Sequence, residues 1–356
     1  MAPGLADRAA LLRILTSPWL AQSCYALVKL GVPDLLAGGP RPAAEIAREC
    51  GAHAGALHRV LRALAAEGMF TVDGDGRYGL GPAGELLSTG VPRSSRDLAV
   101  MLGEEVYRSF ADITYTLQTG QPAFDKVYGQ PFYDYLATNP GAAATFGAAM
   151  AGAAVPAALA SCDLAGARLV VDVGGGDGTL LARVLRAQPQ ARGVLLELPP
   201  AIAGAPERLA RAGVGERARF VAGSFFDTMP AGGDVYVLCR VLHNWPDDDA
   251  VRLLRRIRLA MDPAGRLLVF EDLLGPPASA SPPASASPPA SASPDRGGVM
   301  DLLLLVMLAG QDRTEAQYRE LLSAAGFTVR DVRPPPLRAR QPESVIEAVP
   351  SPHPTP

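Results

Sequence analysis

The second half of the chain alternates short apolar runs with amphipathic segments. The apolar runs, which are typical of buried strands, cover 169–172, 193–196, 218–222, 234–239 and 266–271. Helical spacing predicts helices between and after them, over 179–187, 247–261 and 314–326, and the last precedes a further strand at 327–332. This alternation predicts a parallel, doubly wound α/β sheet, whose ligands bind at the carboxyl ends of its strands.

The first hundred residues have a different, mainly helical pattern. Helical spacing and end signals predict helices over 5–15, 18–30, 42–49 and 54–67. Residues 69–80 then alternate around a turn rich in Asp-Gly, which predicts a β-hairpin. Helices followed by a hairpin indicate a winged helix. We therefore expect a winged-helix domain over 1–100 and an α/β domain over 101–350.

A winged helix raises the possibility of DNA binding, which the charge disfavours. Residues 1–100 hold ten Lys or Arg and nine Asp or Glu, a net charge of 10 − 9 = +1. A DNA-binding face needs a larger positive excess. Arg59 and Arg62 are better interpreted as a solvated helix face. A packing or dimerisation module fits this domain better than a regulator.

Two further segments have distinct compositions. Residues 101–165 are rich in aromatic and small side chains, which suit either the wall of an aromatic substrate pocket or ordinary core packing. Residues 276–296 form a Pro/Ala/Ser-rich insertion that begins with three copies of Pro-Pro-Ala-Ser-Ala-Ser. Because no large apolar side chain interrupts the repeat, we expect a disordered loop without chemistry.

Composition narrows the class of protein. A length of 356 residues with 48% hydrophobic residues allows about two domains, each with a core. The net charge of −3 argues against a general nucleic-acid or acidic-membrane binder. No apolar run approaches the ~20 residues of a membrane span, and residues 1–10 do not resemble a signal peptide. The scattered cysteines, without a Cys-x-x-Cys pair, predict reduced thiols in a cytoplasmic protein.

The most informative stretch is the glycine-dense turn from Asp172 to Gly178, which follows the first strand of the sheet. Glycines let the backbone turn sharply and let a ligand approach closely. The dinucleotide pattern would place a third glycine where Thr179 stands. Asp172 and Asp177 would repel a pyrophosphate but attract an ammonium or sulfonium. We therefore favour S-adenosylmethionine over NAD, and Glu197 suits its ribose diol; a turn without a ligand remains the alternative.

His243 is the one histidine in the α/β half. It follows the end of the predicted strand 234–239, where a catalytic group would face the ligand. A lone histidine is usually structural, but this position favours a catalytic role.

Five segments together resemble one family. They are Asp172–Gly178, Glu197–Pro200, Gly223–Phe226, Arg240–Trp245 and Asp312–Thr314, and they occur in the family's order. Over nearly its whole length the chain resembles caffeic-acid-type small-molecule O-methyltransferases, close to those of bacterial aromatic polyketide pathways. The resemblance implies an N-terminal winged-helix dimerisation domain, a Rossmann-like methyltransferase domain, S-adenosylmethionine as cofactor and a homodimer.

The resemblance also implies residues that contact the cofactor. Gly174 lies against the methionine part, Glu197 takes the ribose hydroxyls, and Ser224 and Phe225 flank the adenine. Position 239 touches the cofactor, although Cys239 departs from the usual Lys or Ser. The other candidate cofactor-binding residues within these segments are Asp172, Gly176 and Arg240. Plant members carry Asp where Glu197 and Ser224 stand.

For chemistry, the resemblance implies methyl transfer to a phenolic hydroxyl with His243 as general base. Glu271 and Asp312 match the acids that orient and polarise this histidine, whereas Asn244 departs from the Asp of plant members. The alternatives are that Glu271 is a solvated strand end and that Asp312 only pairs with Arg313. The residue types suited to a flat apolar acceptor, for which core packing is an equal alternative, are Met150, Trp245, Met300, Leu303 and Met307. A relative that uses the cofactor for another reaction, such as hydroxylation, is the alternative. No metal is implied.

Overall fold

The computed structural model describes residues 4–151, 155–275, 298–337 and 342–352. The chain forms two compact units. The first comprises residues 1–108 and 148–153, and the second comprises 109–147 and 154–356. The predicted insertion at 276–296 lies outside the described residues.

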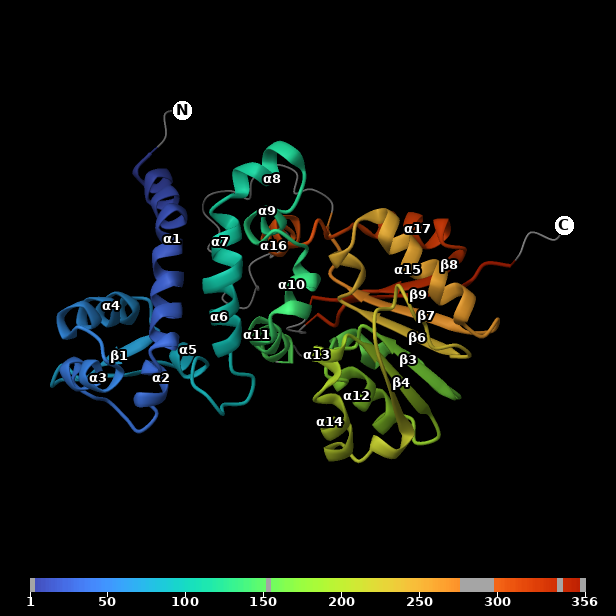
Figure 1. Cartoon of the computed structure of the whole chain (residues 1–356), viewed down its shortest axis with the longest axis horizontal. Helices are drawn as coiled ribbons and strands as arrows, with labels where there is room; N and C mark the ends of the chain where they lie inside the picture. Colours follow the sequence, from blue (N-terminus) through green and yellow to red (C-terminus); the bar gives the residue numbers. More distant parts are fainter. Residues whose placement is uncertain (1–3, 152–154, 276–297, 338–341, 353–356) are drawn as a thin grey trace. The chain divides into compact units, whose positions relative to one another are not determined.

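The first unit is a mainly helical domain with one small hairpin (Figure 1). Its elements are α1 (Leu5–Lys29), α2 (Val32–Leu35), α3 (Ala43–Cys50), α4 (Ala54–Ala66), β1 (Phe70–Val72), β2 (Tyr78–Leu80), α5 (Pro82–Glu85), α6 (Arg96–Met101) and the π-helical turn η1 (Leu102–Val106). Leu27, Ile46, Leu61 and Phe70 belong to one buried cluster. The helices and the antiparallel β1–β2 pair confirm the predicted winged-helix arrangement.

One prediction for this unit is wrong: α1 is a single helix that continues through Pro18. A proline inside a helix leaves the carbonyl four residues earlier without its backbone donor. Here the Ser17 hydroxyl donates to the Ile14 carbonyl at 2.8 Å and replaces that bond. The neighbouring serine therefore lets the helix pass a residue that normally ends it.

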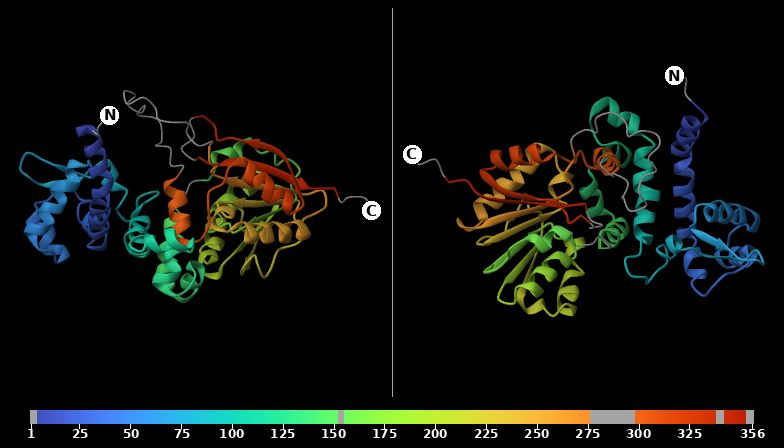
Figure 2. Two further views of the ribbon diagram at one scale, coloured as in Figure 1. Left: turned by 90° about the horizontal axis from the view of Figure 1, so that it is seen from above. Right: turned by 180° about the vertical axis from the view of Figure 1, so that it is seen from behind.

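The second unit is built on a central sheet, which Figure 2 shows from two further directions. Its seven strands follow the order β5-β4-β3-β6-β7-β9-β8. The strands are β3 (Leu169–Val173), β4 (Arg192–Glu197), β5 (Ala218–Ala222), β6 (Val235–Cys239), β7 (Arg266–Glu271), β8 (Phe327–Arg333) and β9 (Ser344–Pro350). The first five are parallel, as predicted. β9, which the sequence pattern did not predict, pairs antiparallel with both β7 and β8.

Helices cover both faces of this sheet. α12 (Thr179–Ala187) and α14 (Ala205–Arg211) pack in one buried cluster with alternate strand residues such as Val170. α15 (Asp247–Ala260) and α17 (Glu315–Ala324) pack in the other with residues such as Val171. Because neighbouring strand residues point to opposite faces, the central strands β3, β4, β6 and β7 are buried along most of their length. The Rossmann-like, doubly wound fold is confirmed.

Short helices make up most of the remainder. They are α7 (Tyr107–Phe110), α8 (Ile113–Thr119), α9 (Ala123–Tyr128), α10 (Phe132–Thr138), α11 (Pro140–Ala151), η2 (Ala157–Ser161), α13 (Pro199–Ile202), η3 (Gly215–Arg217), η4 (Leu242–Asn244) and α16 (Val299–Met307). α16 packs against α8 and α9 within the second unit. No helix among the described residues is long and apolar enough to cross a membrane.

The topology of the sheet locates its ligand edge. From β3 the chain adds β4 and β5 on one side, then crosses over to place β6 on the other side of β3. The strand order therefore reverses between β3 and β6. Ligands of doubly wound sheets bind beyond the carboxyl ends of the strands at such a point.

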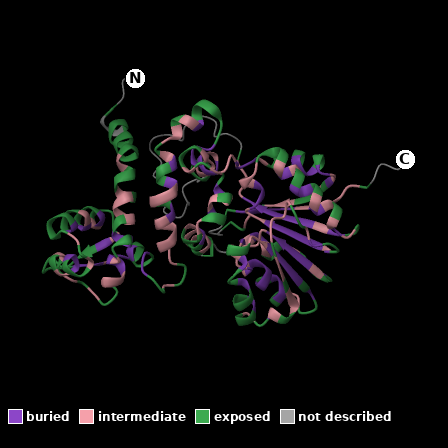
Figure 3. Cartoon of the chain, viewed as in Figure 1, coloured by how far each residue is buried: buried purple, intermediate pink, exposed green. Residues whose placement is uncertain are grey.

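The N-terminal part of α1 is largely exposed (Figure 3), and several of its exposed residues are large and apolar. Ile14 and Trp19 are each 70% exposed, and Leu11 and Leu15 are more than half exposed. An isolated helix of about 12–15 residues is marginal in water even with good helix formers. This part of α1 therefore needs a covering surface, which agrees with the expected homodimer.

We predict that the double variant Ile14→Glu/Trp19→Glu shifts the protein from dimer to monomer, because two charges would be buried in the subunit interface. Size-exclusion chromatography with light scattering measures the mass. Leu117→Glu, at a position 73% exposed in the second unit, is the matched control and should leave the dimer intact. An unchanged mass for the double variant would contradict this assignment.

Candidate active site

The glycine turn after β3 adopts backbone angles that favour glycine. Gly174, Gly176 and Gly178 have φ values of +68°, +59° and +77°, a region that other residues rarely occupy. The Gly174 amide donates to the Leu196 carbonyl at 2.8 Å. A Cβ at Gly174 would lie 3.0 Å from the Val241 side chain. The turn is thus closely packed against the segment that follows β6, at the point where the strand order reverses.

Asp172 lies beneath this turn. Its side chain is fully buried, and a Cβ at Gly175 would come within 2.4 Å of its carboxyl carbon. Burial, with the nearby charge of Glu197, raises the pKa of Asp172 to about 7. Asp172 is therefore placed to support the turn from inside. The other acid of the motif, Asp177, accepts from the amide and hydroxyl of Thr179 and pairs with Arg208 at 2.7 Å.

Glu197 ends β4 and holds the turn from its side. One carboxylate oxygen accepts from the Gly176 amide at 2.9 Å, and the other accepts from the Leu198 amide at 2.6 Å. Burial raises the pKa of Glu197, and these two amides oppose the rise. Each oxygen of a carboxylate can accept more than one bond. The fixed carboxylate therefore retains capacity for a ligand diol.

The segment after β5 contributes an aromatic wall. The Ser224 hydroxyl accepts from the Phe226 amide at 3.1 Å, which fixes a local turn. The Phe225 ring lies 3.6 Å from where a Cβ of Gly174 would stand. It also makes an edge contact with Trp245, with ring centroids 5.7 Å apart. Phe225 therefore links the glycine turn to the segment around His243.

The end of β6 carries Cys239 and Arg240. Burial raises the pKa of the Cys239 thiol to about 12, so the thiol is neutral. Arg240 has a φ of +56°, and its guanidinium pairs with Glu343 at 2.6 Å. Sequence reasoning missed Glu343, which precedes the unpredicted strand β9. Its position becomes informative only once β9 is known to lie beside β7.

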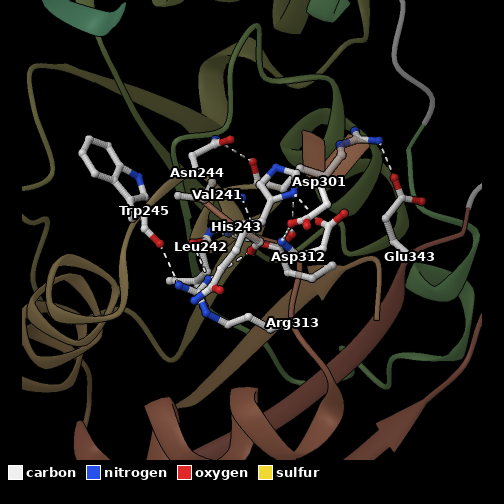
Figure 4. Close-up of polar contacts among 12 residues, drawn as sticks. Val241, Leu242, His243, Asn244, Trp245, Asp301, Asp312, Arg313 and Glu343 are labelled. Atoms are coloured by element: carbon white, nitrogen blue, oxygen red, sulfur yellow. Dashed lines mark hydrogen bonds and ion pairs between the residues drawn. The ribbon is translucent and has the colours of Figure 1, made fainter. Parts of the chain in front are cut away.

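His243 lies on η4, directly after β6, as predicted (Figure 4). Its Nδ1 is 3.3 Å from an Asp312 oxygen and 3.5 Å from a Glu271 oxygen. Burial opposes protonation, but the charges of Glu271 and Asp312 outweigh burial and raise the pKa of His243. With a proton on Nδ1 shared with the acids, the neutral ring keeps a lone pair on Nε2. His243 is thus arranged to accept a proton.

Glu271 does more than face the histidine. Its other oxygen accepts from the amides of Val241, Leu242 and His243 at 3.0, 2.8 and 3.4 Å. The carboxyl is fully buried, and burial raises the pKa of Glu271 while the charge of His243 and the amides oppose the rise. Glu271 therefore fixes the His243 ring and also the backbone around it, residues 241–245, which we call the histidine segment.

Asp312 approaches the histidine from the segment after α16. The Asp312 amide donates to Asp301 on α16 at 2.8 Å. The next residue, Arg313, is fully buried and pairs with Asp247 at 2.7 Å. The structure thus separates two roles that the sequence left open: Asp312 faces His243, and Arg313 pairs elsewhere. Sequence analysis missed Asp301, since a single acid on an apolar helix carries no signal of its own.

The predicted acceptor residues are only partly brought together. Trp245 lies two residues after His243 and stacks on Tyr133, with centroids 5.6 Å apart and planes 17° from parallel. Burial and then the charge of Glu197 raise the pKa of the Tyr133 phenol. An aromatic side chain from the 101–165 stretch therefore lines this region.

The methionine candidates for the acceptor pocket differ in location and in burial. Met300 and Met307 are on α16, which the Asp301 bond joins to the His243 cluster. Met307 is buried in the core, whereas Met300 is 41% exposed. Met150 belongs to the first unit. Among the described residues, no group of three or more His, Cys, Asp or Glu could hold a metal ion.

Comparisons with known proteins agree with this geometry. The model of the O-methyltransferase domain matches residues 108–328, and that of the O-methyltransferase dimerisation domain matches residues 12–90. The chain is 40% identical to a phenazine O-methyltransferase of Lysobacter antibioticus, covering 91% of this chain and 92% of that protein. It is also 40% identical to O-demethylpuromycin-O-methyltransferase of Streptomyces alboniger, covering 95% and 89%.

A solved structure extends the likeness to three dimensions. The O-methyltransferase from neocarzinostatin biosynthesis, in complex with S-adenosylmethionine and 2-hydroxy-5-methyl naphthoic acid, superposes with a TM-score of 0.79. It is 35% identical, and the match covers 95% of this chain and 98% of that one. The chain therefore belongs to the O-methyltransferase family and is an S-adenosylmethionine-dependent enzyme with an N-terminal dimerisation domain, as its motifs implied.

Proposed function

We propose that this enzyme transfers the methyl group of S-adenosylmethionine to a phenolic hydroxyl of an aromatic natural product, with His243 as the general base. The observation that carries the proposal is the contact of His243 Nδ1 with two buried acids at the ligand edge of the sheet. The relatives support the acceptor class, because their names specify a phenazine, demethylpuromycin and a hydroxynaphthoic acid.

The residues around the glycine turn fit the cofactor. The turn allows close approach, and Glu197 is fixed as an acceptor for ribose hydroxyls. Asp172 and Glu197 give this region acidic character, which suits a cationic ligand. When bound, S-adenosylmethionine supplies an electrophilic methyl group on a sulfonium. Gly174, Gly176, Ser224, Phe225, Cys239 and Arg240 complete the proposed cofactor set.

At neutral pH a phenol needs a base to remove its proton, and His243 is that base. A phenol has a pKa near ~10 and is a weak nucleophile until its proton is removed. His243 Nε2 takes that proton, and the charges of Glu271 and Asp312 stabilise the imidazolium that forms. The acids also prevent rotation of the ring. Trp245 and Tyr133 provide an aromatic surface against which a flat acceptor can be oriented.

Hydroxylation with the same cofactor is the alternative reaction, and the complete set of His243, Glu271 and Asp312 favours methyl transfer because such a base is needed for a phenol. We also infer a cytoplasmic location, supported by four cysteines that are all free thiols in the structure.

We predict that His243→Ala lowers the rate of methyl transfer roughly 10²–10⁴-fold, because a general base contributes about that much. Mass spectrometry of polycyclic phenols incubated with enzyme and S-adenosylmethionine measures the product. The control is His58→Ala, which removes a histidine paired with Tyr78 in the first unit. If His243→Ala retains full activity, His243 is not the base. A hydroxylated product would instead support the alternative reaction.

The raised pKa of His243 predicts the pH dependence. The base has to be neutral, so activity falls as pH drops through a pKa above the ordinary value of ~6.5. Asp312→Asn removes one of the charges that raise this pKa and should move the acidic limb of kcat to lower pH. Steady-state rates between about pH 5 and 9 test this. Asp331→Asn, at an exposed ion pair, should leave the limb in place; an unmoved limb in Asp312→Asn refutes the assignment.

Glu197→Gln should weaken binding of S-adenosylhomocysteine by about tenfold or more, because hydrogen bonds to a charged group are worth roughly 1.5–3 kcal/mol. Isothermal titration calorimetry measures the Kd without any methyl transfer. Glu216→Gln, at an exposed position on η3, is the matched control. Equal affinities for both variants would exclude Glu197 from the ribose site.

A further inference from the structure

The fully buried side chain of Arg313 contacts the backbone carbonyls of the histidine segment (Figure 4). One terminal nitrogen of Arg313 donates to the Leu242 carbonyl at 3.1 Å, and the other donates to the Trp245 carbonyl at 2.7 Å. Nε donates to Asp247 at 3.0 Å. The guanidinium therefore spans both flanks of His243 and the first residue of α15.

The residues before Arg313 extend the same contact. The Gln311 amide donates to the His243 carbonyl at 2.9 Å. A Cβ at Gly310 would lie 2.2 Å from that carbonyl oxygen, so the backbones meet directly there. Asp312 then reaches the ring. The segment 310–313 thus contacts the carbonyl edge of the histidine segment, while Glu271 binds its amide edge.

The choice of arginine is not explained by stability alone. Burying a guanidinium carries a desolvation cost, and its partner Asp247 remains 62% exposed at the side chain. Only a planar guanidinium can donate in several fixed directions at once. A lysine could neutralise Asp247 but could not span the Leu242 and Trp245 carbonyls. The arrangement therefore indicates that Arg313 fixes the position of these backbone carbonyls more than it adds to the stability of the fold.

We propose that Arg313 is a positioning residue that keeps the His243 ring against Asp312 and Glu271. The inference rests on the proposed role of His243 as base. With Arg313 in place, both ends of the turn η4 are fixed, and Nδ1 stays beside the two acids. Without its bonds the segment loosens, the acids act less strongly on the ring, and Nε2 is no longer held toward the acceptor.

The test compares Arg313→Lys with wild type in three measurements. Because small misplacements of a catalytic group can cost about a hundredfold in rate, kcat should fall roughly 10- to 100-fold. The Kd for S-adenosylhomocysteine should stay within about twofold, and the acidic limb of kcat should move to lower pH. In protein labelled with ¹⁵N-histidine, the His243 signal, assigned by its loss in His243→Ala, should titrate at lower pH.

Arg217→Lys is the matched control. The Arg217 guanidinium donates to the carbonyls of Leu185, Gln188 and Ala191, beside the end of α12. This variant should lose comparable thermal stability but keep the pH limb and the His243 titration. An unchanged His243 titration in Arg313→Lys overturns the proposal. Because that titration requires no turnover, it tests Arg313 even if His243→Ala shows that His243 is not the base.

Discussion

The bonds from the Glu271 carboxylate to three successive amides are the contact on which this site depends. Buried backbone amides need partners, and the amides that follow β6 find theirs on a side chain at the end of β7. The position of the histidine segment is thereby set by the register of two central strands. The same carboxylate raises the pKa of His243. One buried charge therefore both shapes the segment and tunes its histidine.

Charge is distributed unevenly around the ligand edge. Arg208 pairs with Asp177, and Arg240 pairs with Glu343. Asp172, in contrast, is held under the turn with a pKa of about 7, and burial raises the pKa of Glu197 as well. A cationic ligand would lower both pKa values by stabilising the carboxylates, whereas a pyrophosphate would add repulsion. This electrostatic preference, more than the glycine spacing, distinguishes the site from a dinucleotide site.

The sequence predicted those features that depend on local pattern. The central parallel strands β3, β4, β6 and β7 were visible because burial on both faces leaves them almost continuously apolar. The polar residues at or just after the strand ends gave Glu197, His243 and Glu271 as candidates. β9 was missed because the charged Glu347 interrupts its apolar run, and the ion pair of Glu347 with Arg333 on β8 appears only in the fold. Arg313 was missed as a contact because its partners include backbone carbonyls, which leave no pattern in a sequence.

Asn244 shows why one departure from the family pattern is compatible with the site. Plant members carry Asp at this position, but here the Asn244 amide nitrogen donates to the Arg240 carbonyl at 3.2 Å. An ionised Asp has no proton to donate. Arg240 has a positive φ, which is unfavourable for a residue with a side chain, so this bond supports the bend that directs the chain from β6 into η4. Asn244 therefore acts on the backbone, while the pKa of His243 depends on Glu271 and Asp312.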